Sequence, residues 1–505
     1  MVAMARKAWR QLTSMRTALL LLFLLAVAAV PGSLLPQRGV AIERVQQYLR
    51  EHPDAGPWLD KFSFFDVYSS PWFSAVYLLL FTSLIGCVLP RIRQQAVALF
   101  RPPPVAPRNL DRLPAYVTAP TSRSLDDYAA VLRRSRFRVA VRDGSISAEK
   151  GYLRETGNLL FHCSLIVLLV GVALGSWYGW HGNRLVVEGP DGEFCNTLQQ
   201  YDDYGLGPRV DAADLPPFCV RLDGFAAEYL DNGQPVDFSA EVAYTVDDSA
   251  PSQQKVAVNH PLRLPGANVY LLGHGYAPVL EYTDRFGRTQ QTVAPFLPSD
   301  PQLTSAGAAI FPDANRDPAT GERRYDQQLG FQGVYLPTVP PDPSVGGSLH
   351  PAERNPALML VAYRGNLGVD NGIPHSVYAL NTKQIDAGRL KKIGEPKLLR
   401  AGDVWKLDDG SSVKFVGTRQ WATVSVRNDP GEAIVLAGAV LLLLGLLPSL
   451  SIRRRRIFIR VTDGNVHAGA LARNDYPGLA EELNQLALER PGLHDSDRLV
   501  KEKVS

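Results

Sequence analysis

A single imidazole interrupts a long apolar run of the chain. Residues 157–177 (GNLLFHCSLIVLLVGVALGSW) contain no acidic or basic side chain except His162. At about 1.5 Å of rise per residue, a helix of this length crosses the apolar core of a bilayer. Polar groups there are costly, so they usually face a helix bundle, a cavity or a ligand. Two interpretations stay open: His162 binds a ligand, or it only hydrogen-bonds a neighbouring helix.

The chemistry that suits such an imidazole is ligation of haem iron. Histidine is a common axial ligand, and an amphipathic porphyrin can occupy a groove between helices. A helix entering the membrane at Gly157 has advanced about 8 Å at His162, which predicts a ring near the level of Cys87 and beside Cys163. His162 supplies one ligand, and the second would come from another chain, from water or from these cysteines.

Two more histidines lie between the third and fourth apolar runs. His260 stands beside a turn-forming proline, and His274 stands between two glycines, which let a backbone or a ligand approach closely. Each is a candidate for contacting a cofactor or a substrate. The alternative for both is a position in a surface loop.

The cysteines suggest one covalent link. Cys87 and Cys163 lie in apolar runs, whereas Cys195 and Cys219 lie in the long polar segment that follows the third run. A disulfide between Cys195 and Cys219 would contribute roughly 3 kcal/mol in the chain-entropy model. The alternative is two unpaired buried thiols.

Four apolar runs must position these groups, and each predicts a transmembrane helix. The first could be mistaken for a secretory signal, but no convincing cleavage site follows it. Pro90 marks the predicted end of the second helix. The expected spans are residues 17–36, 71–89, 157–177 and 431–450.

Basic residues predict the orientation of the chain. Residues 1–16 hold four basic and no acidic side chains, residues 90–156 hold thirteen basic and six acidic ones, and Arg453–Arg456 follow the fourth span. The positive-inside rule then places residues 1–16, 90–156 and 451–505 in the cytoplasm of a multi-pass protein of the cell membrane. Residues 37–70 and 178–430 lie on the outer face. The arginine run is a stop-transfer anchor in this interpretation, and nucleic-acid binding is not expected.

The segments outside the membrane differ in pattern. Alternating short runs within residues 178–430 predict a mainly-β domain, with a long irregular excursion over residues 297–355 because proline, glycine and aspartate dominate there. Residues 37–70 contain Val40–Arg50, a predicted amphipathic segment on the membrane surface. The predicted strands of the large domain are 183–187, 218–222, 237–246, 255–258, 269–272, 279–283, 358–363, 413–416 and 422–426.

Two cytoplasmic segments echo each other. Residues 90–156 contain a helical pattern at Leu125–Arg134 and a hairpin around Asp143-Gly144, and the C-terminal tail contains a hairpin around Asp463-Gly464 followed by a helix. A lone hairpin is only marginally stable, so we expect the two segments to pack together as one small α+β unit. The fold class is thus a four-helix membrane protein with a large extracytoplasmic mainly-β domain and a small cytoplasmic α+β unit.

Several strings of residues together resemble the ResB family, also called CcsB, of system II cytochrome c biogenesis. They open and close the first span, precede the second, and begin the third and fourth: Ser14-Met15-Arg16-Thr17-Ala18-Leu19, Gly32-Ser33-Leu34-Leu35-Pro36-Gln37, Phe65-Asp66-Val67-Tyr68-Ser69-Ser70-Pro71-Trp72-Phe73, Gly157-Asn158-Leu159-Leu160-Phe161-His162 and Asp429-Pro430-Gly431-Glu432. The resemblance covers nearly the whole chain, including the order of spans and the large domain before the last one.

The resemblance implies a subunit of a cytochrome c synthetase. Such proteins work with a CcsA-like (ResC) membrane partner to move haem to the outer face and attach it to apocytochrome c. His162 matches the intramembrane histidine implicated in haem binding, and haem would be held transiently and shared with the partner. The chain would then be a non-catalytic or co-catalytic subunit of the haem lyase.

Two other functions remain open. One is a membrane-anchored scaffold whose outer β domain binds a protein partner while His162 is structural. The other is a solute receptor that uses the outer domain. Motifs for nucleotide phosphates, zinc proteases, hydrolases or Cys-x-x-Cys redox centres are absent from the sequence.

Overall fold

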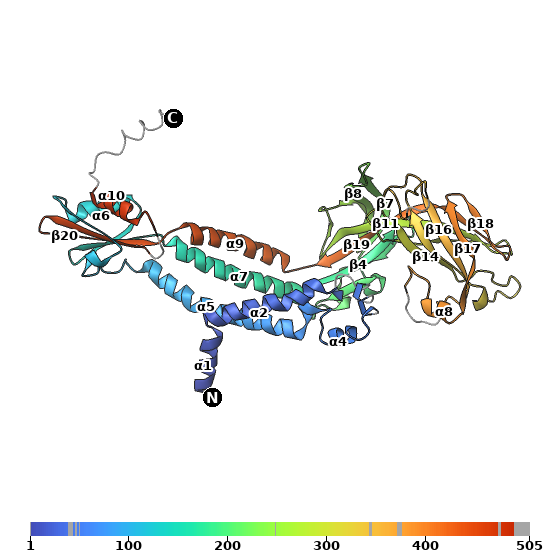
Figure 1. The fold of residues 1–505 in the computed structure, drawn as a ribbon, viewed down its shortest axis with the longest axis horizontal. Coiled ribbons are helices and arrows are strands. Elements are labelled where there is room, and N and C mark those ends of the chain that lie inside the picture. The colour runs from blue at the N-terminus through green and yellow to red at the C-terminus, as the bar shows by residue number, and fades with distance from the viewer. Residues whose placement is uncertain are drawn as a thin grey trace, which may run out of the picture. The chain divides into compact units, whose positions relative to one another are not determined.

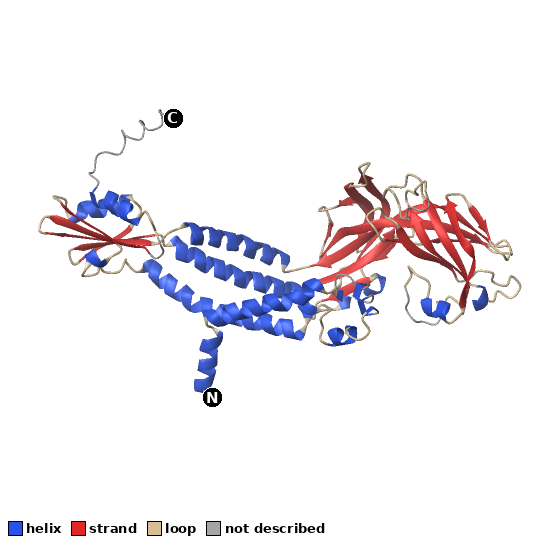
Figure 2. Ribbon diagram, in the orientation of Figure 1, coloured by secondary structure: helices blue, strands red, loops and turns tan. Residues whose placement is uncertain are grey.

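The computed structural model describes residues 2–38, 44–45, 48–49, 51–247, 249–342, 346–370, 376–472 and 476–488. The chain divides into two compact units, labelled by element in Figure 1. Unit 1 comprises Met1–Gly175 and Pro430–Ser505, and unit 2 comprises Ser176–Asp429. Long helices and a small sheet make up unit 1, whereas strands dominate unit 2 (Figure 2). Most of the predicted surface helix Val40–Arg50 lies outside the described residues.

Four helices are long and apolar enough to cross a membrane, which confirms the predicted number of spans among the described residues. They are α2 (Met15–Leu34), α5 (Pro71–Phe100), α7 (Leu153–Tyr178) and α9 (Glu432–Ser451). The hydroxyl groups of Ser14 and Ser70 cap α2 and α5 by accepting hydrogen bonds from backbone N–H groups of the first turn. Helix α1 (Val2–Leu12) precedes α2, and the short helix α4 (Gly56–Lys61) precedes α5.

Pro90 does not end the second long helix, so that prediction is wrong. Helix α5 continues to Phe100 with Pro90 in its interior. A proline removes one backbone hydrogen bond, but hydrogen bonds on either side can keep such a helix continuous. The continuation matters because it carries Arg91, Gln94 and Gln95 along the same helix.

Glycines let α7 and α9 approach closely. Gly438 and Gly445 are seven residues apart, or about two helical turns, so they share a face of α9. A methyl group at Gly438 would lie 2.9 Å from Cγ of Leu168, and one at Gly157 would lie 2.7 Å from the carbonyl oxygen of Gly445. Without a hydrophobic driving force inside a bilayer, such backbone contact is a main source of helix association.

A five-stranded antiparallel sheet joins the two segments that the sequence predicts to pack together. Its order is β1-β21-β20-β3-β2, and the register sets Ile457 of β20 opposite Ala148 of β3. Helices α6 (Leu125–Arg134) and α10 (Leu479–Leu488) bury Leu132 and Leu483 in the same core. The predicted α+β unit is confirmed, with one strand that was not predicted, β1. The strands are β1 (Ala115–Pro120), β2 (Arg138–Arg142), β3 (Ser145–Lys150), β20 (Arg455–Thr462) and β21 (Asn465–Ala472).

Both hairpins of this sheet turn where Asp-Gly predicts a turn. Asp143 and Gly144 have φ angles of 48° and 66°, and Asp463 and Gly464 have φ angles of 52° and 71°. Two consecutive positive φ angles are the signature of a type I′ turn, whose twist matches the flanking strands.

The arginine run after α9 forms ion pairs inside unit 1. Glu149 is only 1% exposed, and Arg454 and Arg456 contact it at 2.5 and 3.1 Å. Arg454 also pairs with Glu155 in the first turn of α7. Burial raises the pKa of Glu149, but hydrogen bonds from Tyr152 and Arg454 and the charges of the two arginines outweigh it and hold the pKa below its usual value. The run therefore also fixes the sheet against the start of α7.

Three antiparallel sheets form unit 2. The first is ordered β10-β11-β19-β4-β6, with β12 on β11 and β18 on β19; the second is β13-β14-β15-β16-β17; the third is β5-β7-β8-β9. A short helix, α8 (Thr382–Asp386), precedes β17. The strands are β4 (Trp180–Val187), β5 (Glu193–Cys195), β6 (Asp203–Leu206), β7 (Phe218–Tyr229), β8 (Pro235–Val246), β9 (Ser252–Ala257), β10 (Leu262–Leu264), β11 (Ala267–Thr283), β12 (Thr289–Val293), β13 (Leu297–Pro298), β14 (Ser305–Phe311), β15 (Leu329–Leu336), β16 (Ala357–Gly365), β17 (Leu390–Arg400), β18 (Val404–Lys406) and β19 (Ser412–Asn428).

Two long strands connect the two larger hydrophobic cores among the described residues of unit 2. The sequence predicts two strands in each of the regions covered by β11 and β19, but each is one strand of 17 residues. They pair along their length, with shifts of register at Leu271/Gly273 and Val279/Leu280. Val269 packs in one core and Leu280 in the other. The bulges let one strand change direction, which a strictly periodic pattern cannot reveal.

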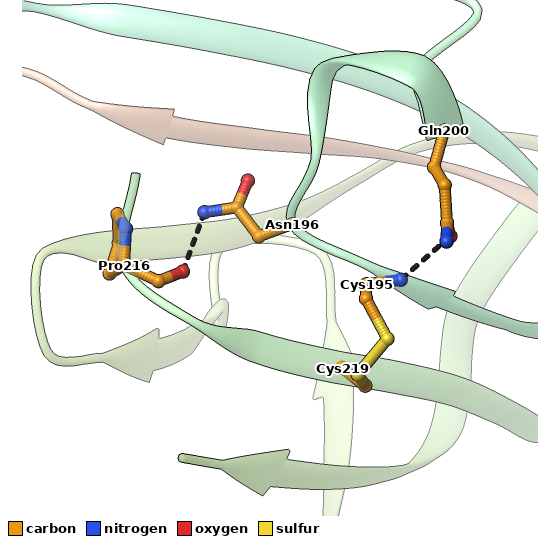
Figure 3. The surroundings of a disulfide bond; sticks show 5 residues. All are labelled: Cys195, Asn196, Gln200, Pro216 and Cys219. Atoms are coloured by element: carbon orange, nitrogen blue, oxygen red, sulfur yellow. Dashed lines mark hydrogen bonds between the residues drawn. A yellow bond between two sulfur atoms is a disulfide. The ribbon is translucent and has the colours of Figure 1, made fainter. Parts of the chain in front are cut away.

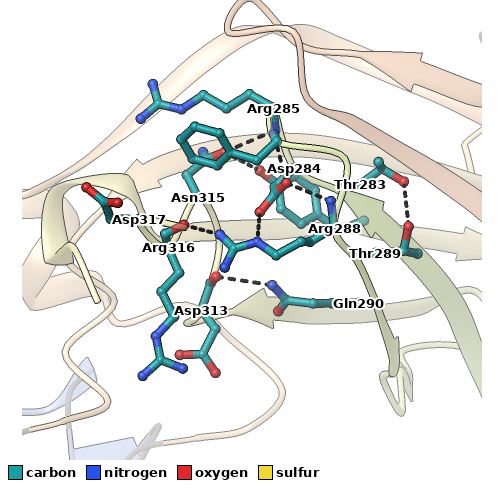
Figure 4. Close-up of polar contacts among 12 residues, drawn as sticks. Thr283, Asp284, Arg285, Arg288, Thr289, Gln290, Asp313, Asn315, Arg316 and Asp317 are labelled. Atoms are coloured by element: carbon teal, nitrogen blue, oxygen red, sulfur yellow. Dashed lines mark hydrogen bonds and ion pairs between the residues drawn. The ribbon is translucent and has the colours of Figure 1, made fainter. Parts of the chain in front are cut away.

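Residues 297–355 are not one irregular excursion, so that prediction is wrong for the described part of the segment. It contains β13, β14 and β15, and its polar loop is tied to the β11–β12 hairpin (Figure 4). The carboxylate of Asp284, which is 3% exposed, accepts a hydrogen bond of 2.9 Å from Nε of Arg288. Asn315 accepts one from the hydroxyl of Tyr282 at 3.2 Å, and the carbonyl of Asp313 accepts one from Gln290. Side chains outside the segment thus order a composition that looks irregular.

Candidate functional site

His162 is held by its own helix. Its Nδ1 atom lies 2.7 Å from the carbonyl oxygen of Asn158, one turn earlier in α7. A carbonyl oxygen only accepts hydrogen bonds, so Nδ1 must carry the hydrogen. In the neutral ring Nε2 then keeps a free lone pair, and no partner for Nε2 occurs among the described residues. A hydrogen bond of this kind fixes the tautomer and orientation that a metal-ligating histidine needs.

The ring lines a cleft between α5 and α7. The cleft has a volume of about 380 Å³, which falls within the range of ligand pockets. Its position agrees with the predicted level, since Val88, next to Cys87, lines it. Neither Cys87 nor Cys163 is among the lining residues, which are Val88, Arg91, Gln94, Gln95 and Ala98 of α5 and Glu155, Asn158, Leu159 and His162 of α7.

The two walls of the cleft differ in charge. Glu155 on α7 is paired with Arg454, whereas Arg91 on α5 forms no ion pair in the described part of the chain. Nη2 of the Arg91 guanidinium group lies 3.9 Å from the sulfur atom of Met15. A planar guanidinium can donate two parallel hydrogen bonds to a carboxylate. The cleft therefore contains an imidazole with an uncommitted Nε2 and a guanidinium group without an ion-pair partner among the described residues.

Sequence reasoning misses the α5 wall because Pro90 is a local signal for a helix end. Val88, Arg91, Gln95 and Ala98 follow the spacing of three and four residues that places side chains on one helix face. The same spacing can be read from the sequence if the helix is assumed to continue through Pro90.

His274 lies in a closed aromatic cluster of unit 2. Its ring stacks on Phe225 with centroids 4.9 Å apart, and Nε2 is 2.8 Å from the hydroxyl oxygen of Tyr229. Nδ1 is buried and has no hydrogen-bond partner among the described residues. Burial lowers the pKa of His274 to about 4, so the ring is neutral near pH 7. The His274 cluster is thus a packed joint between β7, β8 and β11, and it does not share the His162 cleft.

His260 lies in an exposed turn. Its Nδ1 is 3.2 Å from the carbonyl oxygen of Val258, and Asn259 before it has a φ angle of 63°. No group of three or more His, Cys, Asp or Glu side chains suited to a metal occurs among the described residues. The geometry of His260 is that of a loop residue.

Cys195 and Cys219 face each other across β5 and β7, and their sulfur atoms are bonded (Figure 3). Cys87 and Cys163 are free thiols. The bonded pair lines a cleft of about 460 Å³ in unit 2.

Comparison with known proteins gives one consistent result. The model of the ResB-like family matches residues 15–484. A protein of Synechococcus sp. (strain RCC307) named "Cytochrome c biogenesis protein CcsB" is 27% identical over 499 residues, which cover 96% of this chain and 97% of that protein. Proteins of the same name from Gloeobacter violaceus and from Synechococcus sp. (strain WH7803) are 24% and 25% identical, covering 97% and 94% of this chain and 93% and 96% of theirs. The chain therefore belongs to the ResB-like family.

Proposed function

We propose that this protein is a membrane subunit of cytochrome c biogenesis that binds haem at the His162 cleft. The observation that carries the proposal is a histidine whose Nε2 is free, in a cleft between two membrane helices. His162 would ligate the iron through Nε2, and Arg91 would pair with a propionate. The porphyrin edge would lie against Val88, Leu159 and Ala98. The bound haem supplies the porphyrin that is later joined to the cysteines of apocytochrome c.

In this proposal the chain does not perform the attachment alone. A CcsA/ResC-like membrane partner supplies the second ligand of the haem iron. Haem is then shared between this chain and the partner. The β-rich unit would stand on the outer face of the cytoplasmic membrane, with both termini in the cytoplasm, and would present apocytochrome c. Two supports are the family of the chain and the names of its relatives.

The test is the haem content of the full-length protein purified together with its partner. We expect His162→Ala to lower bound haem at least tenfold and to abolish cytochrome c maturation, because the partner alone cannot replace the lost iron ligand. The matched control is His260→Ala, which removes an exposed imidazole from a turn and should leave the absorption spectrum unchanged.

A second variant separates ligation from folding. In His162→Gly, imidazole added to the buffer should restore a haem spectrum, because it can occupy the space that the side chain leaves. Equal haem content in wild type and His162→Ala, with normal maturation, would favour the scaffold function instead.

A further inference from the structure

Helix α1 has an apolar face that is open to the outside. Met4, Ala8 and Leu12 follow a spacing of four residues, which places them on one side of the helix. Trp9 extends this side, because it follows Ala8 directly and lies three residues before Leu12. The side chains of Met4 and Trp9 are 76% and 53% exposed. Large exposed apolar side chains that share one helix face indicate an interaction surface.

The opposite face of α1 is basic. Arg6 and Arg10 lie one helical turn apart, and Lys7 lies three residues before Arg10, so the three side chains share a face. All three are exposed, and the chain has no acidic residue before Glu43. A helix with tryptophan and aliphatic side chains on one face and arginine and lysine on the other is typical of segments that lie in a membrane surface.

Hydrogen bonds fix the end of α1 to two membrane helices. The last carbonyl groups of a helix have no partner within it, so they need partners from elsewhere. The carbonyl oxygen of Gln11 accepts a hydrogen bond of 2.7 Å from the hydroxyl group of Thr17 in α2. That of Leu12 accepts one of 2.6 Å from the hydroxyl group of Ser83 in α5. The direction of α1 is therefore set by side chains of α2 and α5.

Helix α5 also leaves room for the turn between α1 and α2. A methyl group at Gly86 would clash with Cγ2 of Thr13, and it would lie 3.6 Å from Cζ2 of Trp9. The thiol group of Cys87 donates a hydrogen bond to the carbonyl oxygen of Thr13. Ser14 then has an extended backbone and caps α2, so the chain changes direction and α1 turns away from α2 (Figure 1). The contact of Trp9 shows that the apolar face of α1 turns toward the membrane helices.

The position of α1 along the chain indicates which surface it meets. Helix α2 is long and apolar enough to cross a membrane, and it begins at Met15, three residues after α1 ends. Helix α1 therefore lies where this span leaves the bilayer. A protein partner is the alternative occupant of the apolar face. The continuity with a membrane span and the purely basic charge of the helix favour a bilayer with anionic headgroups.

We propose that α1 lies in the bilayer surface at the N-terminal end of α2 and binds anionic lipids. Its apolar face inserts about 5–10 Å into the boundary between headgroups and acyl chains. Arg6, Lys7 and Arg10 face the headgroups and contact their phosphate groups. This proposal goes beyond haem binding and does not rest on His162.

The experiment measures the depth of α1 in nanodiscs that contain the full-length protein. A nitroxide spin label is attached to Ala8→Cys on the apolar face or to the matched Ala3→Cys on the basic face. The background carries Cys163→Ala and Cys87→Ser, in which the serine keeps a donor for Thr13, and the bonded pair of unit 2 does not react. Power saturation compares the access of oxygen, which concentrates among acyl chains, with that of a nickel complex, which stays in water.

The depth is measured in discs of phosphatidylcholine and in discs that also contain phosphatidylglycerol. With phosphatidylglycerol, oxygen should reach the Ala8→Cys label better than nickel does, and the Ala3→Cys label should show the reverse. Equal access of nickel to both labels in both kinds of disc would overturn the proposal. Protection of the Ala8→Cys label only when the membrane partner is present would also overturn it, because the occupant would then be a protein.

A charge variant tests the role of anionic lipid. Replacing the three basic residues of α1 by glutamine should lower the ratio of inserted to detached helix about fivefold for each charge removed, in discs with phosphatidylglycerol only. The matched control replaces the exposed Arg133, Arg134 and Arg142 of α6 and β2 by glutamine, which removes the same charge elsewhere in unit 1. The control should insert as the wild type does. Equal insertion of the α1 charge variant and the wild type would contradict the proposal.

Discussion

His162 and His274 are both half-satisfied imidazoles, and their surroundings differ. Each has one ring nitrogen in a hydrogen bond, to Asn158 for His162 and to Tyr229 for His274. The other nitrogen of His162 belongs to a ring that lines a cleft, while the other nitrogen of His274 is sealed among aromatic rings without a partner. An open lone pair can take a ligand, whereas a sealed one only makes protonation costly.

The two histidines also depend on different supports. The helix of His162 is fixed by contacts at its ends and along its length, namely the ion pairs of Glu149 and Glu155 and the glycine contact with α9. His274 is fixed by the rings that touch it, Phe225, Phe238 and Tyr229. Substitutions far from His162 should therefore alter its position, whereas the His274 cluster should respond mainly to substitutions of the rings that touch it.

The largest effect is expected at Glu149. Glu149→Gln leaves Arg456 without its partner and removes one of the two partners of Arg454, and breaking a buried ion pair costs about 3 kcal/mol. Hydrogen exchange of strands β3 and β20 should rise accordingly, and the proposed haem binding at His162 should weaken. The control is Glu481→Gln, an exposed carboxylate of α10, where exchange should stay the same. Unchanged protection of β20 in Glu149→Gln would show that the ion pairs do not anchor the sheet.

The next effect is the pH dependence of unit 2. The pKa of His274 is about 4 in the folded protein and 6.5 in a free side chain. Above pH 6.5 the ring is neutral in both states; as the pH falls from 6.5 towards 4 the unfolded chain binds the proton first, so stability drops by roughly 3 kcal/mol. Hydrogen exchange of β11, corrected for the intrinsic effect of pH, should show this loss in the wild type and much less of it in His274→Phe. If the stability of β11 depended on pH equally in both proteins, His274 would not be the source of the loss.

A smaller effect is expected where α7 meets α9. A side chain at Gly445 would meet the backbone of α7 near Phe161, and overpacking of this kind costs about 1–3 kcal/mol. Gly445→Leu should therefore displace α7 and weaken the haem binding that we propose at His162, measured by titration of the purified complex. Leu444→Ala changes an exposed neighbour on α9 and serves as the control. Equal affinities would show that the cleft does not depend on this helix contact.

The smallest effect concerns Arg91. Arg91→Gln removes the charge that we assign to a propionate, and a charge-assisted hydrogen bond contributes about 1.5 kcal/mol, or roughly tenfold in affinity. Arg93→Gln makes the same chemical change on α5 at a residue that does not line the cleft. Haem affinity should fall in the first variant only. Equal losses in both would point to a general effect of positive charge on α5.

The sequence alone predicted four helices long and apolar enough to cross a membrane, because long apolar runs are a strong local signal. It also determined the α+β unit, since two Asp-Gly turns at the same place in two hairpins are strong local signals. It could not give the α5 wall of the cleft, because Pro90 is a local signal for a helix end and the neighbouring turns override it.

Only the tertiary structure decided which histidine is open and which is sealed. In the sequence, His162 and His274 look similar: His162 is a polar ring in an apolar stretch, and His274 is a polar ring between two glycines. Their difference comes from residues far away in the chain: α5 leaves space beside one ring, and β7 and β8 close over the other. Burial and free space depend on how distant segments pack together, so a local sequence pattern cannot predict them.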